Sequence, residues 1–85
     1  MRIAVGSDER AIVADSAIEF LRFKMFDVEL HGALKHGDTT QWADLARRVG
    51  ERVSSGACNH GVLFCWTGTG VSIAANKVIG VRAAL

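Results

Sequence analysis

The sequence has almost no excess charge, only two cysteines and no long hydrophobic segment. Ten Lys and Arg residues against nine Asp and Glu give the 85 residues a formal net charge of +1. Nucleic-acid binders and membrane-surface binders carry a basic excess on one face, so this balance argues against both partners. No apolar run approaches the roughly 20 residues that cross a bilayer. The first ten residues also lack the apolar region of a signal peptide. We therefore expect a cytoplasmic protein.

The two cysteines exclude further kinds of site. Six residues separate Cys58 from Cys65, which is not a zinc spacing, and no cluster of His or Cys completes four ligands. A single pair of cysteines is also a poor disulfide framework. We therefore predict no metal ion at the functional site, and we interpret Cys58 as a thiol in a turn.

What is present is the pattern of one small globular domain over residues 1–85, with 49% hydrophobic and 22% charged residues. Short apolar runs predict strands at residues 2–6, 27–31, 60–65 and 81–85. Amphipathic patterns predict helices over residues 11–23, 41–55 and 71–77. Regular alternation of strand and helix predicts a three-layer α/β/α Rossmann-like fold with a parallel sheet.

Several details of this prediction can be checked in a structure. In the second helix we expect Trp42 in the core, Thr40 as the N-cap and Gly56 just past the C-terminal end. Four consecutive apolar residues at 62–65 predict a strand buried on both faces. The strand at residues 81–85 has no helix to cover it, so we expect the chain to be the N-terminal portion of a domain.

Two loops follow predicted strands and are candidates for a ligand site, because doubly wound sheets bind ligands beyond the carboxyl ends of their strands. These are residues 6–9 and residues 65–70. In the second loop, Gly68 and Gly70 let backbone amides converge, and the following helix offers its positive end, so this loop suits a phosphate or an oxyanion. The P-loop pattern is absent, and the dinucleotide pattern G-x-G-x-x-G fails at Ile73, which argues against a nicotinamide cofactor.

Cys65 ends the third strand and faces the same loop as Thr67. Backbone N–H groups and a helix N-terminus favour a thiolate, and a thiolate beside a hydroxyl and an oxyanion cradle can abstract a proton next to a carbonyl. Alternatively, Cys65 is a small buried hydrophobic residue that finishes a strand. Local sequence leaves both interpretations open.

The string C-W-T-G-T-G-V-S-I-A-A-N-K at residues 65–77 resembles the signature of the ribose-5-phosphate isomerase B and galactose-6-phosphate isomerase family. The start, M-R-I-A-V-G-S-D-E, resembles that family's first strand and acidic turn, and the resemblance extends over essentially all 85 residues. It implies an enzyme that interconverts aldose and ketose phosphates through a cis-enediol, with no metal or organic cofactor. It also implies a homodimer or higher homo-oligomer with active sites at the subunit interface.

The resemblance implies a role for each matching residue. Cys65 matches the catalytic base that moves a proton between C1 and C2, and Thr67 matches the hydroxyl that assists at the substrate oxygens. Asp38 lies where the family has another substrate-side loop. The residues expected to bind the substrate are Asp8, Glu9, Trp66, Gly68, Thr69 and Gly70.

The sequence departs from the family pattern at two of these positions. Glu9 stands where the family usually has His, and Trp66 stands where it usually has a small residue. The family's ring-opening His and phosphate-binding Arg residues are expected beyond Leu85. Two alternatives therefore stay open: a non-catalytic module that binds a sugar phosphate or nucleotide, and a pseudoenzyme subunit of a mixed oligomer.

Overall fold

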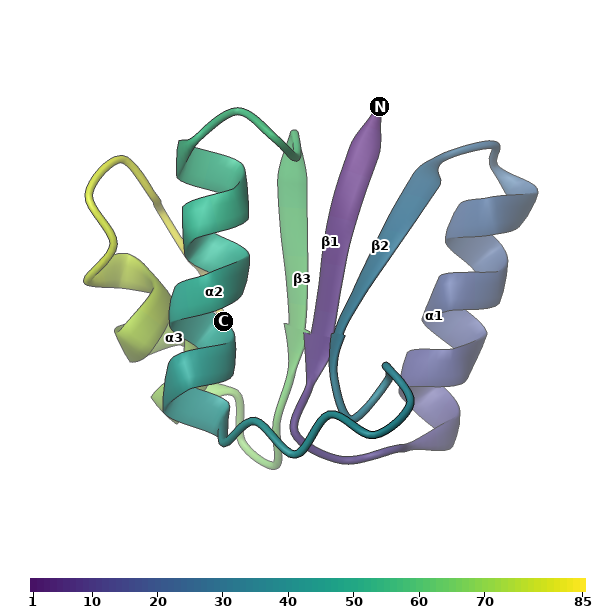
Figure 1. Cartoon of the computed structure of the whole chain (residues 1–85), viewed down its shortest axis with the longest axis horizontal. Helices are drawn as coiled ribbons and strands as arrows, with labels where there is room; N and C mark the ends of the chain where they lie inside the picture. The colour runs from purple at the N-terminus through teal and green to yellow at the C-terminus, as the bar shows by residue number, and fades with distance from the viewer.

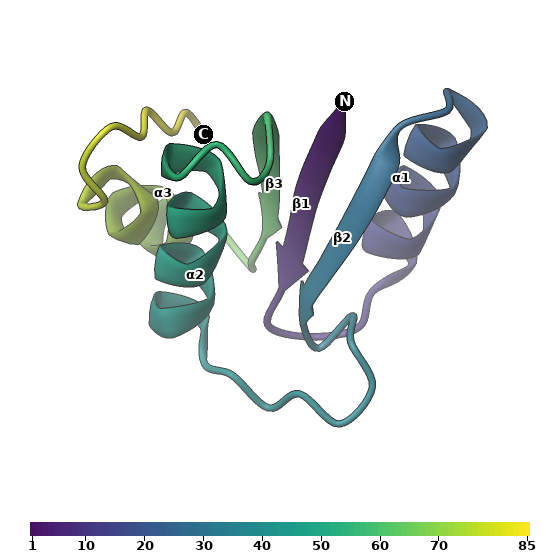
Figure 2. The same cartoon turned by 45° about the horizontal axis from the view of Figure 1, so that its top comes forward.

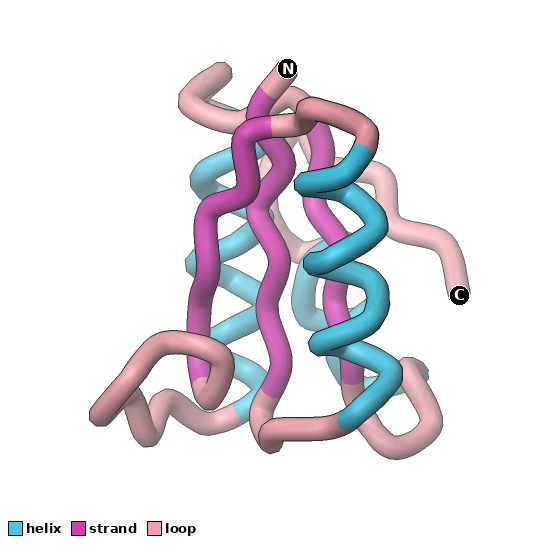
Figure 3. Tube along the Cα trace, turned by 90° about the vertical axis from the view of Figure 1, so that its right-hand side faces the viewer, coloured by secondary structure: helices cyan, strands magenta, loops and turns pink.

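The computed structural model describes all residues from 1 to 85, and strands and helices alternate along the chain (Figure 1). The elements are β1 (Arg2–Ser7), α1 (Ile12–Phe23), β2 (Asp27–Gly32), α2 (Trp42–Ser54), β3 (His60–Phe64) and α3 (Thr69–Asn76). The three strands are parallel and lie side by side in the order β2-β1-β3 (Figure 3). The predicted parallel α/β architecture is confirmed. No helix is long and apolar enough to cross a membrane.

Helices cover both faces of the sheet, with α1 on one face and α2 and α3 on the other (Figure 1). The alternation of side chains along β1 explains these layers, because successive residues of a strand point to opposite faces. Ile3 and Val5 pack with Ala14 and Ile18 of α1. Ala4 packs on the other face, in a cluster with Leu45 and other α2 residues.

The parallel register brings the carboxyl ends of all three strands to one edge of the sheet. Ser7, the last residue of β1, lies opposite Gly32 of β2 and Phe64 of β3. Gly32 has a φ of +69°, and a Cβ there would lie 2.3 Å from the carbonyl oxygen of Ser7, so only glycine fits. The loops after β1, β2 and β3 therefore leave the sheet beside one another, which positions the candidate site.

A polar cluster ties α2 to β2. Arg52 donates from Nε and Nη2 to the two carboxylate oxygens of Glu29, at 2.7 Å each, and His31 Nε2 lies 2.7 Å from Glu29 Oε1. The bonds from Arg52 are the main cause that lowers the pKa of Glu29 to about 2. Such bidentate, charge-assisted pairs fix geometry as well as adding energy, so the position of α2 over the sheet is well defined.

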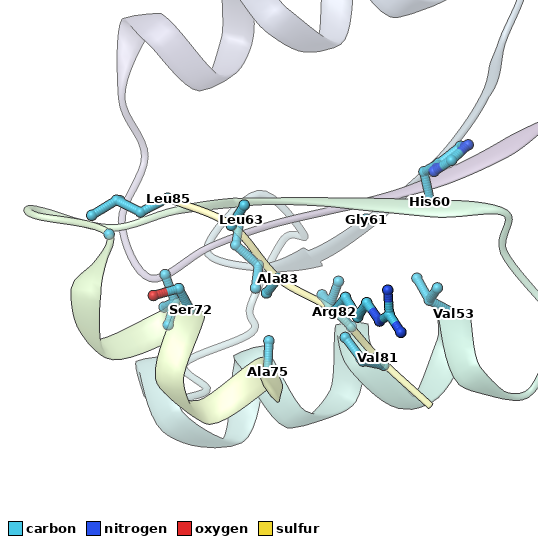
Figure 4. A pocket seen from close by; sticks show the side chains of 15 residues that line it. Val53, His60, Gly61, Leu63, Ser72, Ala75, Val81, Arg82, Ala83 and Leu85 are labelled. Carbon is cyan, nitrogen blue, oxygen red and sulfur yellow. The ribbon is translucent and has the colours of Figure 1, made fainter. Parts of the chain in front are cut away.

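The expected fourth strand is wrong, because residues 81–85 have no strand conformation. The backbone of Ala83 bonds instead to the side chain of Asn76: Ala83 N donates to Asn76 Oδ1, and Asn76 Nδ2 donates to Ala83 O, both at 2.9 Å. Val81 and Ala83 pack toward α2 and α3, and Figure 4 shows this segment between β3 and those helices. The Asn76 side chain thus forms the backbone hydrogen bonds that Ala83 would otherwise make to a neighbouring strand.

Three smaller expectations also differ. Residues 62–65 are half-buried rather than buried on both faces, because β3 is an edge strand here. Trp42 is 42% exposed and is not core. Gln41 rather than Thr40 occupies the N-cap, and the Thr40 hydroxyl bonds Asp38 instead. Gly56 follows the end of α2 with a φ of +82°, as predicted.

Candidate active site

The site is built where β1 and β3, neighbours in the sheet, both end. Asp8 follows the last residue of β1, and Cys65 follows the last residue of β3. Because the strands are parallel and in register, these two side chains leave the sheet at the same edge, and Cys65 Sγ lies 4.0 Å from Asp8 Oδ2. Both residues are half-buried. The structure therefore brings together a thiol and a carboxylate that lie 57 residues apart in sequence.

The Asp8 carboxylate is only partly satisfied. Its Oδ2 accepts the long contact from the Cys65 thiol, whereas Oδ1 is buried and has no hydrogen-bond partner in the protein. A buried acceptor without a donor is costly, and such atoms are rare in native structures. A hydroxyl group from a ligand would satisfy this oxygen, and a sugar carries several such donors.

Ser7 shapes the turn that presents Asp8, and sequence reasoning did not single it out. Its buried hydroxyl donates to the carbonyl oxygen of Glu9 and accepts from the Glu9 amide at 3.3 Å. This local ring of bonds is the kind of turn that Ser forms with the backbone two residues on. It leaves the Glu9 side chain exposed.

The loop at residues 65–70 turns the chain from β3 into α3. Gly68 has a φ of +79° at the N-cap of α3, and the Ser72 amide donates to its carbonyl at 3.0 Å. Thr67 Oγ1 accepts from the Thr69 amide at 3.2 Å, so this hydroxyl caps one N–H at the start of the helix. The first turn of any helix leaves N–H groups without partners inside the helix, and here that turn begins four residues after Cys65.

The other predicted site residues lie around this loop in different environments. The Trp66 side chain is 85% exposed. Gly68 lies under Leu85, whose Cδ1 would be 2.4 Å from a Cβ at that position. Gly70 lies against the ring of Trp42. The structure thus brings Asp8, Cys65 and the glycine loop to one edge, while the side chains of Glu9 and Trp66 extend into solvent.

Asp38 belongs to the loop between β2 and α2, which extends beyond the sheet edge (Figure 2). Its carboxylate accepts from the amide of Thr40 at 2.9 Å, from the Thr40 hydroxyl and from Arg48 Nη1 at 3.0 Å. The bonds from Thr40, with a smaller contribution from Arg48, lower the pKa of Asp38 to about 2. Asp38 is therefore engaged in holding its own loop on α2.

The three main hollows of the structure are not lined by Asp8, Cys65 or Thr67. A hollow of about 240 Å³ lies under residues 81–85, between β3, α2 and α3 (Figure 4), but Asp8, Cys65 and Thr67 do not line it. Two further surface hollows, one along α2 and α3 and one beside α1, also leave these residues out. No three His, Cys, Asp or Glu side chains are grouped so that they could hold a metal ion.

A parallel α/β fold with a thiol, a carboxylate and a glycine loop at its carboxyl edge defines the class of small α/β proteins that bind ligands at the ends of their strands. Comparison with known proteins gives the particular family. The model of the Ribose/Galactose Isomerase family matches residues 3–85, and the chain belongs to this family. The family assignment expected from residues 65–77 is confirmed.

Individual relatives agree with this assignment. The chain is 34% identical over 85 residues to the D-erythrulose-4-phosphate isomerase of Pectobacterium atrosepticum, a match that covers 99% of the chain and 56% of that protein. It is 38% identical over 88 residues to the galactose-6-phosphate isomerase subunit LacB of Clostridium acetobutylicum, covering 100% of the chain and 49% of the relative. The solved ribose-5-phosphate isomerase B of Clostridium thermocellum superposes with a TM-score of 0.86 at 40% identity, covering 99% of this chain and 57% of that one. The chain thus spans about half the length of these relatives.

Proposed function

We propose that this chain carries the proton-transfer centre of an aldose–ketose isomerase that acts on a phosphorylated sugar. The observation that carries the proposal is the meeting of Cys65 with Asp8, whose second oxygen is buried without a donor, at the carboxyl edge of the sheet. Family membership supports the reaction class. The structure of these two loops supports the assignment of the residues.

The proposed reaction needs one base and one anion-stabilising loop. Cys65, as thiolate, takes the proton from C2 of the aldose. The electrons of that C–H bond form the C1–C2 double bond, and the carbonyl electrons move to O1. Amides of the glycine loop stabilise the resulting enediolate, and Thr67 passes a proton between O1 and O2. Return of the proton from Cys65 to C1 gives the ketose.

Asp8 has two tasks in this proposal. In the resting state its Oδ2 accepts the thiol hydrogen of Cys65 and so orients the sulfur before the thiol loses that proton. Its Oδ1 accepts from a hydroxyl of the open-chain sugar and thereby places C1 and C2 in front of the thiol. The Ser7 bonds to the Glu9 backbone hold this turn in shape.

A phosphorylated sugar is the shared chemistry of the three relatives, whose names specify erythrulose 4-phosphate, galactose 6-phosphate and ribose 5-phosphate. We infer that ribose 5-phosphate and ribulose 5-phosphate, or a related pentose or hexose phosphate, are the substrates. One relative is named as a subunit, and we propose that this chain also functions in a homodimer or larger homo-oligomer.

The decisive test replaces Cys65 by Ala. The protein is a chimera in which the part of the Clostridium thermocellum isomerase that follows the matched region is joined after Leu85. The readout is exchange of the C2 hydrogen of sugar phosphates with solvent deuterium, followed by NMR. Loss of a general base costs about 10²- to 10⁴-fold, so Cys65→Ala should reduce exchange by at least about 100-fold. Cys58→Ala is the matched control and should retain exchange, and an unchanged rate in Cys65→Ala would reject the mechanism.

Binding without catalysis is the second candidate. The observation that favours it is Glu9: a carboxylate follows Asp8 where the resemblance expects His, and its side chain extends into solvent. A chain that binds a sugar phosphate in a calorimetric titration, but whose chimera exchanges no C2 hydrogen, would support this candidate over the isomerase.

A further inference from the structure

Trp42 lies directly against the start of α3, a contact that the proposed mechanism does not use. A Cβ added to Gly70 would lie 3.0 Å from Trp42 Cζ3 and 3.3 Å from Cε3 and Cη2. These distances mean that the indole ring is in van der Waals contact with the backbone of Gly70, in the first turn of α3. The ring is half-exposed because its other side faces the groove between α2 and α3.

The rest of the contact between α2 and α3 lies farther from the candidate site. Gly50 of α2 approaches Val78, just beyond the end of α3, so closely that a Cβ at Gly50 would lie 2.9 Å from the valine. Between the two ends, Ala46 packs with Val71 and Ala75. All these side chains are small, whereas Trp42 supplies the one aromatic contact, at the end that joins the glycine loop. Figure 1 shows the two helices side by side.

The two helices also differ in how they are fixed to the sheet. Arg52 binds α2 to Glu29 of β2 with two bonds of 2.7 Å. No hydrogen bond of this kind joins an α3 side chain to a strand. The orientation of α3, and with it the position of its first amides, therefore depends on packing, against α2 on one side and against Leu63 and Cys65 on the other.

We propose that Trp42 is a positioning residue for the glycine loop: its ring sets the place of the first turn of α3 and so holds the loop amides at Cys65. The proposal rests on the proposed function for its meaning in catalysis. The proposal also makes a physical claim, that the environment of Cys65 depends on the contact between the Trp42 ring and Gly70, and this claim can be tested without turnover.

The test measures the alkylation rate of each cysteine in the 85-residue chain with iodoacetamide at one fixed pH, by mass spectrometry. In Trp42→Leu, Cys65 should react about two- to fivefold more slowly, the size of a helix-terminus charge interaction. Val78→Ala is the matched control, because it loosens the same helix pair at the opposite end, and Cys65 should then react at the parent rate. An unchanged or faster rate in Trp42→Leu, or an equal fall in Val78→Ala, would overturn the proposal.

A rescue experiment covers the case in which Trp42→Leu is poorly folded. Gly70→Ala adds a methyl group against the ring and should lower the Cys65 rate, and adding Trp42→Phe, with its smaller ring, should restore at least half of the loss. Trp42→Phe alone should stay within about twofold of the parent, because a ring still contacts Gly70. Absence of rescue contradicts the proposal. None of these rates depends on isomerase activity, so they succeed or fail separately from the Cys65→Ala exchange test.

Discussion

Each of the two cysteines lies near a carboxylate, Cys58 near Glu29 and Cys65 near Asp8, and the two carboxylates are bonded in opposite ways. Beside Cys58, the Glu29 carboxylate is saturated by Arg52 and His31 at 2.7 Å. Beside Cys65, the Asp8 carboxylate has one long contact of 4.0 Å and one buried oxygen without a donor. A saturated polar cluster stabilises a fold, whereas an unsaturated one is free to bind a ligand. The contrast separates the structural thiol from the candidate catalytic one.

The sharpest way to break this comparison is to change the unsaturated carboxylate. Asp8→Asn keeps the shape but makes the side chain a weaker, neutral acceptor for a sugar hydroxyl. We expect C2 hydrogen exchange in the chimera to fall about 100-fold, which corresponds to about 2.7 kcal/mol, with little change in the free energy of unfolding. Asp15→Asn, on the exposed side of α1, is the control and should exchange at the parent rate. Parent-like exchange in Asp8→Asn would remove Asp8 from the site.

The reverse result is expected for the saturated carboxylate. Glu29→Gln removes the negative charge and one of the two oxygens that accept from Arg52, and we expect the free energy of unfolding to fall by about 2 kcal/mol. Exchange activity of the folded chimera should stay within about twofold of the parent. Urea unfolding of the 85-residue chain measures the first quantity. If exchange in the folded Glu29→Gln chimera falls by much more than twofold, the two clusters are not separate.

The reactivity of the two thiols compares the regions directly. Burial, and after it the nearby Glu29 carboxylate, raises the pKa of the Cys58 thiol. Because thiolates are the reactive form, Cys58 should be alkylated at least about tenfold more slowly than the half-buried Cys65 at pH 7. Peptide mapping of the labelled chain measures the ratio, and the difference should disappear in urea. Equal rates in the folded chain would contradict the assignment of Cys58 as structural.

The smallest expected effect is a change in the shape of the acid unfolding curve. The pKa of Glu29 is about 2 in the folded chain and near 4.5 when it is unperturbed. A lowered folded pKa contributes stability that is complete above the unfolded value and is lost as the pH falls toward the folded value. The stability gap between the parent and Glu29→Gln should therefore narrow between about pH 5 and pH 2. If the difference in the free energy of unfolding stays constant over this range, protonation of Glu29 does not contribute to it.

The order and type of the elements could be predicted from the sequence, because apolar periodicity is a local property. The wrong predictions concern residues whose conformation depends on contacts with distant parts of the chain. Residues 81–85 are apolar like a strand, but Asn76 binds the backbone of Ala83. Trp42 follows the helical stripe, yet it is the first residue of α2, is 42% exposed and contacts Gly70 of α3 instead.

The candidate site likewise contains residues that the sequence indicated and residues that it did not. Its residue types could be chosen from local chemistry and family resemblance, and Cys65, Thr67 and the two glycines all belong to one short stretch of chain. The roles of Ser7 and Arg52 could not, since a serine or an arginine has no sequence signal until its bonding partners are known. Asp38, expected in a substrate-side loop, bonds Thr40 of that loop and Arg48 of α2, and no sequence pattern indicated the bond to Arg48.

By itself, the sequence determined the family, the alternation of strands and helices, and a glycine loop that suits an anion. Each of these depends on residues that lie close together in the sequence. Tertiary structure alone decided that Asp8 meets Cys65, that Glu29 is saturated and that Trp42 touches Gly70. The physical reason is that parallel strands in register bring together side chains 57 residues apart, and that the direction of each side chain depends on what packs around it.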